Sequence, residues 1–596
     1  MLTTTNRTDY DYGDKAIYGR GVLDLGKAVR GPGEFGAEGF APVFRADTQG
    51  LDSQFSNNIR GTGGLVKAGA GSLILSGHNT YTGATRIEGG RLAVNGDTSL
   101  SRFTVEAGGT LGGTGKVGST EVYGRLAPGN SIGTLTVVGD YTQHAGSVLE
   151  IEVDAAGGSD RVDVQGNAHL HGGTVQLIGL TGAVVGQEYT FLSVGGAIDG
   201  PGFAGVHDGF VFADLRLVST GKGIRLAVER NPTTFAQLGR TDNQRGAARA
   251  IEALGAGARP YELLIGLQAP HEAPDLYDQL SGELHATARS MVAEDVGMAR
   301  SAVMGRLWSG AWGRADSFTP HNTRSNGLWG HAMSAWGRYD GAGVAQDTRR
   351  FGSGFMLGRD VEGASGLQAG VALGYTRSQV RAERHNEAAL DGYHLLAYGA
   401  VTQGPWRLRA GMGQSWFTVD TRREIDAAGL GRQTARYGAW ATQMFTEVGH
   451  MLPVGEAVVE PYLGVTQIWQ GGRDFKEDGQ APLTGHASHD SLTHTTLGAR
   501  GYWQIDTPGG DLRLMAGAGW VHALGGLSPH VRLAYQGGGG QDYALSGVPR
   551  ARNALQIELK ASLAHTPVAS LELGYLGQIG GGVQNHGLRL QASYRF

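Results

Sequence analysis

The period of the hydrophobic positions changes along the chain. Between about residues 35 and 230, short apolar runs such as Leu73–Leu75 and Thr134–Val138 recur at roughly ten-residue spacing, with glycine-rich turns between them. Strands of this length with Gly, Asn and Asp turns predict either a β-sandwich or a parallel β-helix. In a β-helix every second residue of a rung is buried, and glycine serves the sharp turns.

From Thr233 onward the period is close to four, which predicts helices. Phe235 and Ile251 belong to an apolar face that ends near Gly255. A second helical pattern begins at Asp275, and its 25 residues from Glu283 to Leu307 would extend about 37 Å. Charged residues surround the apolar stripe of this second helix, so it is unsuited to contact with lipid but suited to a polar barrel lumen. We expect four of them to contact the lumen wall: Arg289, Glu294, Asp295 and Arg300.

Residues 328–596 contain some twelve runs of ten to sixteen residues with period-two hydrophobicity. Soluble strands average five or six residues, whereas a tilted strand needs about nine to eleven to cross a bilayer. Short turns, for example at 403–405 and 507–509, alternate with longer polar stretches. The longer stretches predict extracellular loops at 381–388, 421–436, 471–490 and 525–551. This alternation is typical of an outer-membrane β-barrel, with short turns on the periplasmic side.

Aromatic and acidic residues of the predicted barrel have expected positions. Aromatic residues toward the strand ends predict an interfacial girdle made of Tyr375, Tyr398, Trp416, Trp469, Trp503, Trp520 and Tyr575. We expect Glu447, Glu460 and Glu558 to line a wet lumen, paired with Arg289, Arg300 or Arg513.

Composition narrows the function classes. The chain has 596 residues, of which 102 are glycine and none is cysteine, with a formal net charge of −5. The lack of cysteine excludes a disulfide framework and cysteine nucleophiles, and it suits a chain that crosses an oxidising compartment unfolded. The near-neutral charge gives no reason to expect nucleic-acid binding. The first residues lack the apolar core of a signal peptide, so we expect that the chain is a fragment or that its true beginning lies upstream.

Two motifs invite a chemical reading that their context does not support. Residues 129–133 match the Gly-x-Ser-x-Gly nucleophile elbow, but β runs lie on both sides, where the elbow needs a strand followed by a helix. His169 and His171 share one face of a predicted strand, which favours solvated polar positions over a metal site. We therefore predict no catalytic residue, no cofactor and no metal.

Several segments resemble those of one family. Residues 63–92 resemble the passenger-associated repeat of autotransporters, and residues 126–135 resemble another segment of their β-helical passengers. The terminal Tyr594-Arg595-Phe596 resembles the aromatic-x-Phe signal that the barrel-assembly machinery recognises, so Tyr594 and Phe596 are candidate assembly residues. Residues 18–29 resemble the last turn and helix of a subtilisin-like protease domain. Together these segments identify the chain as similar to a classical type V (Va) autotransporter, specifically the C-terminal part of a subtilisin-like serine-protease autotransporter.

The resemblance implies a fold and a domain order. It implies an all-β chain with a right-handed parallel β-helix passenger, a linker α-helix and a C-terminal 12-stranded antiparallel transmembrane barrel. The expected domains are the end of a subtilisin-like domain (1–34), the passenger (35–230), a helical linker entering the pore (231–310) and the barrel (328–596).

The resemblance also implies a location and partners. We expect a monomeric barrel in the bacterial outer membrane, with the lipid bilayer, the barrel-assembly machinery and periplasmic chaperones as partners and the passenger at the cell surface. The Asp, His and Gly-Thr-Ser-Met motifs of the protease class are missing, so the chain as given is not expected to be an enzyme. Two alternatives stay open: a surface protease whose triad lies upstream of Met1, and an adhesin-type passenger.

Overall fold

A computed structural model describes residues 4–6, 22–154, 156–178, 185–207, 209–309, 325–363, 367–382, 386–507, 510–537, 541–564 and 569–595. The chain forms two compact units. The first comprises Met1–Thr233 with Glu262–Pro270, and the second comprises Thr234–Tyr261 with His271–Phe596.

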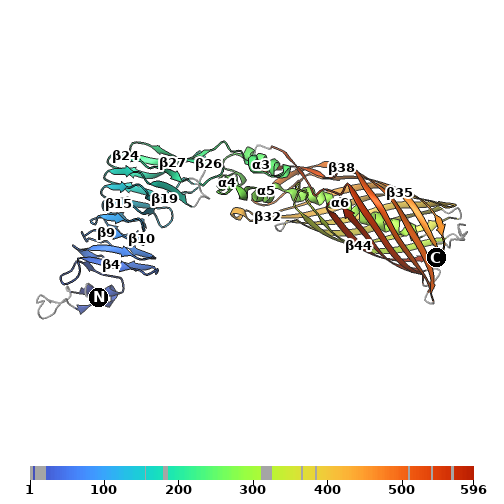
Figure 1. Ribbon diagram of the computed structural model, residues 1–596, viewed down its shortest axis with the longest axis horizontal. Helices are drawn as coiled ribbons and strands as arrows, with labels where there is room; N and C mark the ends of the chain where they lie inside the picture. Colours follow the sequence, from blue (N-terminus) through green and yellow to red (C-terminus); the bar gives the residue numbers. More distant parts are fainter. Residues whose placement is uncertain are drawn as a thin grey trace. The chain divides into compact units, whose positions relative to one another are not determined.

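The first unit is a stack of short parallel strands arranged as three sheets (Figure 1). One sheet contains β4 (Val43–Asp47), β7 (Gly64–Ala68), β9 (Thr85–Ile87), β12 (Phe103–Val105), β15 (Thr120–Val122), β18 (Tyr141–Gln143), β21 (Ala168–His171) and β24 (Ile198–Gly202). The second contains β5 (Ser53–Phe55), β8 (Ser72–Leu75), β10 (Gly90–Val94), β13 (Gly109–Gly113), β16 (Arg125–Pro128), β19 (Val148–Glu152), β22 (Thr174–Ile178) and β25 (Gly205–His207). The third contains β11 (Asp97–Thr98), β14 (Lys116–Val117), β17 (Thr134–Val137), β20 (Arg161–Val164), β23 (Glu188–Val194), β27 (Gly223–Arg230) and β26 (Ala213–Ser219).

Of the two folds that the strand spacing predicts, the parallel β-helix is therefore the one observed. Register aligns the buried residues of successive rungs into columns. One column runs through Leu73, Leu92, Leu111, Leu126, Leu149 and Val175, all fully buried. The last strands differ, because β27 pairs antiparallel with both β23 and β26.

The N-terminal end of this unit consists of small elements. They are β1 (Thr5–Asn6), β2 (Val22–Leu23), α2 (Leu25–Ala28), β3 (Glu34–Phe35) and β6 (Arg60–Gly61). The predicted helix here is a single turn, capped by Asp24, whose Oδ1 accepts from the Lys27 backbone N–H (2.9 Å). Leu25 and Val29 are 65% and 81% exposed, so this turn packs little of its apolar surface.

The second unit is built on a closed antiparallel barrel (Figure 1). Its strands are β28 (Ser325–Tyr339), β29 (Thr348–Glu362), β30 (Leu367–Ala382), β31 (Glu387–Gln403), β32 (Trp406–Ile425), β33 (Gly431–His450), β34 (Leu452–Val454), β35 (Ala457–Gly472), β38 (Ser488–Thr507), β39 (Gly510–Gly525), β42 (Asn553–Ala564), β43 (Ala569–Gly580) and β44 (Val583–Arg595). Because β34 continues β33 after Met451, these make the twelve predicted strands. The sheet closes where β28 pairs with β44, and closure leaves no exposed edge.

Side chains alternate between the lumen and the lipid-facing exterior. On β30, Leu367, Val371 and Leu373 are between 48% and 62% exposed, and large apolar residues are exposed on the outer face of strand after strand. Of the predicted girdle, Trp416, Trp469, Trp503 and Trp520 are exposed on the outside. Tyr398 was predicted wrongly, because it is 5% exposed and its hydroxyl donates to Asp360 inside the barrel (3.1 Å).

The predicted short turn at 403–405 is confirmed, and most of the turn at 507–509 lies outside the described residues. Three predicted long loops contain strands. Residues 421–436 are mostly strand, because β32 and β33 extend beyond their neighbours and only a short connection with η5 (Ala427–Gly429) joins them. Loops 471–490 and 525–551 contain strands that pair into a four-stranded sheet. This sheet consists of β36 (Phe475–Lys476), β37 (Leu483–His486), β40 (His530–Tyr535) and β41 (Tyr543–Ser546).

The helices lie in the segment that the sequence assigns to a linker. They are η3 (Phe235–Leu238), α3 (Asp242–Leu254), α4 (Arg259–Ile265), η4 (Pro270–Glu272), α5 (Ala273–Ser281) and α6 (Glu283–Ser309). The first predicted helix starts later than expected, because Thr241 and Gln244 form a capping box that begins α3. No helix in the described residues has both the length and the apolar character needed to cross a bilayer.

Candidate functional site

The candidate site is the barrel lumen, which α6 occupies (Figure 1). The predicted continuous helix is divided at Gly282, whose φ of +77° ends α5 and starts α6 in a new direction. A side chain at this position would also collide with Leu483, 2.4 Å from the expected Cβ. Within the lumen, α6 packs against the inner faces of β28 to β33 and β35.

The four predicted pore-helix residues all lie against the barrel wall. Arg289 pairs with Asp490 (3.0 Å), and Asp295 pairs with Arg350. The Asn585 amide donates to Glu294 (2.8 Å), whereas Arg300 makes a longer contact to the Gln443 side chain (3.3 Å). Their side chains therefore face four different parts of the wall.

Sequence reasoning missed three other contacts of α6. Arg306 forms a two-pronged pair with Asp360, with N···O distances of 2.7 and 2.8 Å. Trp308 donates from its indole to Glu447 (3.1 Å), and His285 approaches Glu477 (2.9 Å). Arg306 is one of the charged residues that flank the apolar stripe of the helix, so its position in the lumen could have been predicted. The sequence around Arg306 contains no feature that identifies Asp360 as its partner.

Where α6 ends, five charged side chains of the wall form one buried network. Arg500 donates to both oxygens of Glu447 (2.9 and 2.6 Å) and to Glu558 (3.3 Å), while Arg409 donates to Glu460 (2.6 Å) and Glu447 (2.9 Å). The acids were predicted correctly to face the lumen. Their partners were predicted wrongly, since Arg409 and Arg500 take the places expected for Arg289, Arg300 and Arg513.

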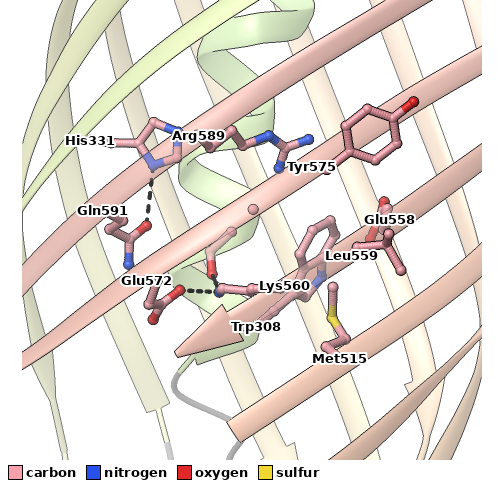
Figure 2. Close-up of a pocket in the computed structure, with 12 residues that line it drawn as sticks. Trp308, His331, Met515, Glu558, Leu559, Lys560, Glu572, Tyr575, Arg589 and Gln591 are labelled. Atoms are coloured by element: carbon pink, nitrogen blue, oxygen red, sulfur yellow. Dashed lines mark hydrogen bonds and ion pairs between the residues drawn. The ribbon is translucent and has the colours of Figure 1, made fainter. Parts of the chain in front are cut away.

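The network holds the last turn of α6. The Arg500 guanidinium carbon lies 4.1 Å from the ring centroid of Trp308 and 3.5 Å from that of Tyr462, so it is stacked against both rings. Figure 2 shows the neighbouring wall, where Lys560 pairs with Glu572 and donates to the carbonyl of Gly305 (3.0 Å). A guanidinium and an ammonium of the barrel thus contact two residues of the last turn of α6, Trp308 and Gly305.

Comparisons with known proteins agree with this geometry. The Autotransporter beta-domain family matches residues 328–576, and the Passenger-associated-transport-repeat family matches residues 65–94. The chain is 29% identical to an extracellular serine protease of Serratia marcescens over 91% of its own length, and it spans 57% of that relative. It is 35% identical to the autotransporter lipoprotein NalP of Neisseria meningitidis serogroup B, over 29% of this chain and 14% of the relative.

Through residues 328–576 the chain carries an autotransporter beta-domain. Its barrel is embedded in the outer membrane and its passenger is at the cell surface. Among solved structures, the chain is similar to the translocator domain of NalP from Neisseria meningitidis. The alignment covers 52% of this chain and 99% of that domain, with 17% identity and a TM-score of 0.39. The chain spans little more than half the length of the Serratia relatives it matches.

The sheet formed by the long loops contacts the helices at the mouth of the lumen. The Tyr535 and Tyr543 hydroxyls donate to the carbonyls of Leu280 and Ser281, both at 2.8 Å. Asn243 of α3 exchanges two hydrogen bonds with the backbone of Ser546, also at 2.8 Å. The sheet therefore satisfies the carbonyls that the break at Gly282 leaves open.

Glu477, beside this sheet, ties the start of α6 to the barrel. Its carboxylate accepts from Arg423 (2.7 Å), His285 (2.9 Å) and the Leu483 backbone N–H (2.9 Å). Burial alone would raise the pKa of Glu477, but the Arg423 guanidinium outweighs burial and holds the pKa at about 2, below the ordinary 4.5. The carboxylate therefore stabilises the folded state when it is ionised.

Glu477 gives the barrel an acid-sensitive contact. Its folded pKa lies below the unfolded value, so its stabilisation is present above about pH 4.5 and is lost as the pH falls toward 2. We expect Glu477→Gln to cost roughly 1–3 kcal/mol at pH 7 and little at pH 2. Thermal melts of the refolded chain between pH 2 and 7 would measure this, with Glu424→Gln, at a half-buried position, as control. A constant difference across the range would contradict the assignment.

The other residues singled out from the sequence lie outside the lumen where the structure describes them. Tyr594 is 53% exposed on the barrel exterior, opposite Leu328, and Phe596 lies outside the described residues. Ser131 of the elbow-like motif lies between strands β16 and β17. His169 is held by Asp199 (2.8 Å), and no group of three His, Asp or Glu side chains in the described residues could hold a metal.

Proposed function

We propose that α6, held by the pore contacts of Arg289, Glu294, Asp295 and Arg300, closes the barrel after it has exported the β-helix, and that folding of the β-helix outside the cell gives export its direction. One observation carries the proposal: α6 fills the lumen and is held to its wall by two ion pairs and two side-chain hydrogen bonds. The columns of buried rung residues support the second part, because rungs that have folded cannot return through an occupied pore.

A tagged chain tests export and anchoring. An epitope inserted at Gly221, in the exposed turn between β26 and β27, should be reached by antibody on intact cells. The same tag in a chain that ends at Leu307, and so lacks the barrel, should be reached only after the outer membrane is opened. Equal labelling of both chains on intact cells would refute the proposal.

We propose that the barrel-assembly machinery recognises Tyr594 and Phe596, with periplasmic chaperones delivering the unfolded chain. The support is the aromatic-x-Phe terminus on a strand that closes the barrel by pairing with β28. Deleting Phe596 should lower the level of assembled barrel several-fold, measured as heat-modifiable protein in outer-membrane fractions. Replacing Ser593, which precedes the motif, by Ala should leave that level unchanged, and wild-type assembly without Phe596 would contradict the role.

We further propose that this chain is the secretion part of a serine-protease autotransporter and has no protease activity of its own. The support is the similarity to Serratia proteins named extracellular serine proteases, together with the missing Asp, His and Gly-Thr-Ser-Met motifs. Residues 1–34 would then be the end of a subtilisin-like domain. The purified chain should leave a casein substrate intact under conditions in which subtilisin cleaves it, and serine-dependent cleavage would overturn the proposal.

A further inference from the structure

Three arginines stand side by side on the outer wall of the barrel at its extracellular end. Arg338 on β28 is directly opposite Arg349 on β29, which is directly opposite Arg381 on β30. All three side chains are exposed. Like charges directly opposite on neighbouring strands destabilise a sheet unless an anion compensates them.

The row begins where the lipid-facing surface ends. On β28, Leu328, Ala332 and Trp336 are exposed apolar residues of the exterior face, and Arg338 is the next outward position after Trp336. On β29 the exposed Phe351 is the last apolar exterior residue before the extracellular end, and Arg349 is the next exterior position toward that end. Aromatic residues mark the interface between the apolar band and the headgroups of an outer membrane. The arginine row therefore lies at the level of the headgroups of the outer leaflet.

Aromatic residues on the adjoining strands support this placement. Register aligns Phe355, Tyr375, Tyr393, Trp416 and Trp440 across β29 to β33 as one exterior row. On β30, Arg377 follows Tyr375 at the next outward position and Arg381 lies two positions further on. The basic side chains thus follow the aromatic band on successive strands.

The charges around the row are only partly compensated. Arg381 pairs with Glu387 (3.1 Å) and Arg377 with Asp391 (3.5 Å). Within the described ranges, no ion pair joins Arg338 or Arg349 to a carboxylate. The acids of the adjoining loop, Asp340 and Asp347, accept backbone N–H groups of that loop at 2.7 and 2.9 Å.

We propose that Arg338, Arg349 and Arg381 bind the phosphate groups of a phosphorylated glycolipid in the outer leaflet. A guanidinium matches a phosphate with two parallel hydrogen bonds, and adjacent guanidinium groups suit a headgroup with more than one phosphate. The acyl chains of such a lipid would lie against Trp336 and Phe351, directly below the row. The occupant is a lipid rather than a free anion, since the site continues into the apolar band.

Binding of lipid A to the refolded full chain in detergent micelles tests the site. We expect Arg338→Gln/Arg349→Gln to bind lipid A on the order of tenfold more weakly, because two charge-assisted contacts are lost. The matched control is Arg432→Gln/Arg436→Gln, which removes two exterior arginines that already pair with Glu424 and Asp420 and should bind as the wild type does. Heat modifiability of all variants checks that the barrels are folded.

The lipid itself provides the second arm. Dephosphorylated lipid A should bind the wild type as weakly as lipid A binds the double variant, and millimolar inorganic phosphate should not displace the bound lipid. Binding of the double variant within twofold of the wild type would overturn the proposal. So would equal binding of lipid A with and without its phosphates, or displacement by free phosphate, which would indicate a simple anion site.

Discussion

Replacing Arg500 by Met is expected to destabilise the barrel by about 3–5 kcal/mol, because it leaves carboxylates uncompensated in a buried site. Arg500 is 1% exposed and is the principal partner of Glu447 and Glu558. The substitution also removes the cation that stacks on Trp308, so the last turn of α6 loses its anchor. The temperature at which the refolded barrel loses its compact form on a gel would measure the effect.

Two control variants separate charge from geometry. Arg436→Met removes an exposed arginine that pairs with Asp420 at 3.5 Å and should change stability by less than about 1 kcal/mol. Arg500→Lys keeps the charge but not the forked geometry, so it should fall between Arg500→Met and the wild type. An unfolding free energy of Arg500→Met within about 1 kcal/mol of the wild-type value would contradict this prediction. It would mean that water, and not Arg500, compensates the charge of these carboxylates.

Replacing Val137 by Asp is expected to unfold the middle of the β-helix, with a cost of at least about 4 kcal/mol. Val137 is fully buried and aligned between Val117 and Val164, which are 0% and 1% exposed. A carboxylate in this column would have no polar partner at a neighbouring buried rung position. If folding outside the cell gives export its direction, display of the passenger on intact cells should fall as well.

The neighbouring position provides the control. Thr136 points outward, between Lys116 and Asp163 in register, so Thr136→Asp should fold and be displayed normally. Leu177→Asp, in a buried position of β22, should behave as Val137→Asp does. Protease resistance of the displayed passenger reports folding, and antibody labelling of intact cells reports export. Wild-type display of a protease-sensitive Val137→Asp passenger would show that folding does not drive export.

The positions of the charged residues were easier to predict than their partners. The side chains of a strand alternate between its two faces, so Glu447, Glu460 and Glu558 could be assigned to the lumen from local sequence alone. Which arginine each meets depends on how twelve strands are staggered around the barrel. Glu447 and its partner Arg500 lie 53 residues apart, and Arg306 and Asp360 lie 54 apart, on different elements.

The loops show the same limit. Residues 471–490 and 525–551 are polar and have no sustained alternation, so they were predicted as loops. Their four short strands form a sheet because β37 pairs with β40, almost fifty residues away, and because the helices supply a surface to pack on. Strands of two to six residues leave too little periodicity to be detected in a sequence.

The sequence by itself determined the class of each part: short glycine-punctuated strands, a charged helix and long alternating strands that end in an aromatic signal. Each of these is a local pattern, since side-chain direction follows from backbone geometry over a few residues. The tertiary structure decided the choice of a β-helix over a sandwich, the break at Gly282, the pairs that hold α6 and the row of arginines outside the barrel. These features depend on strand register and on closure of the barrel, which bring together residues that are distant in the chain. The periodicity of a local segment contains no information about such distant partners.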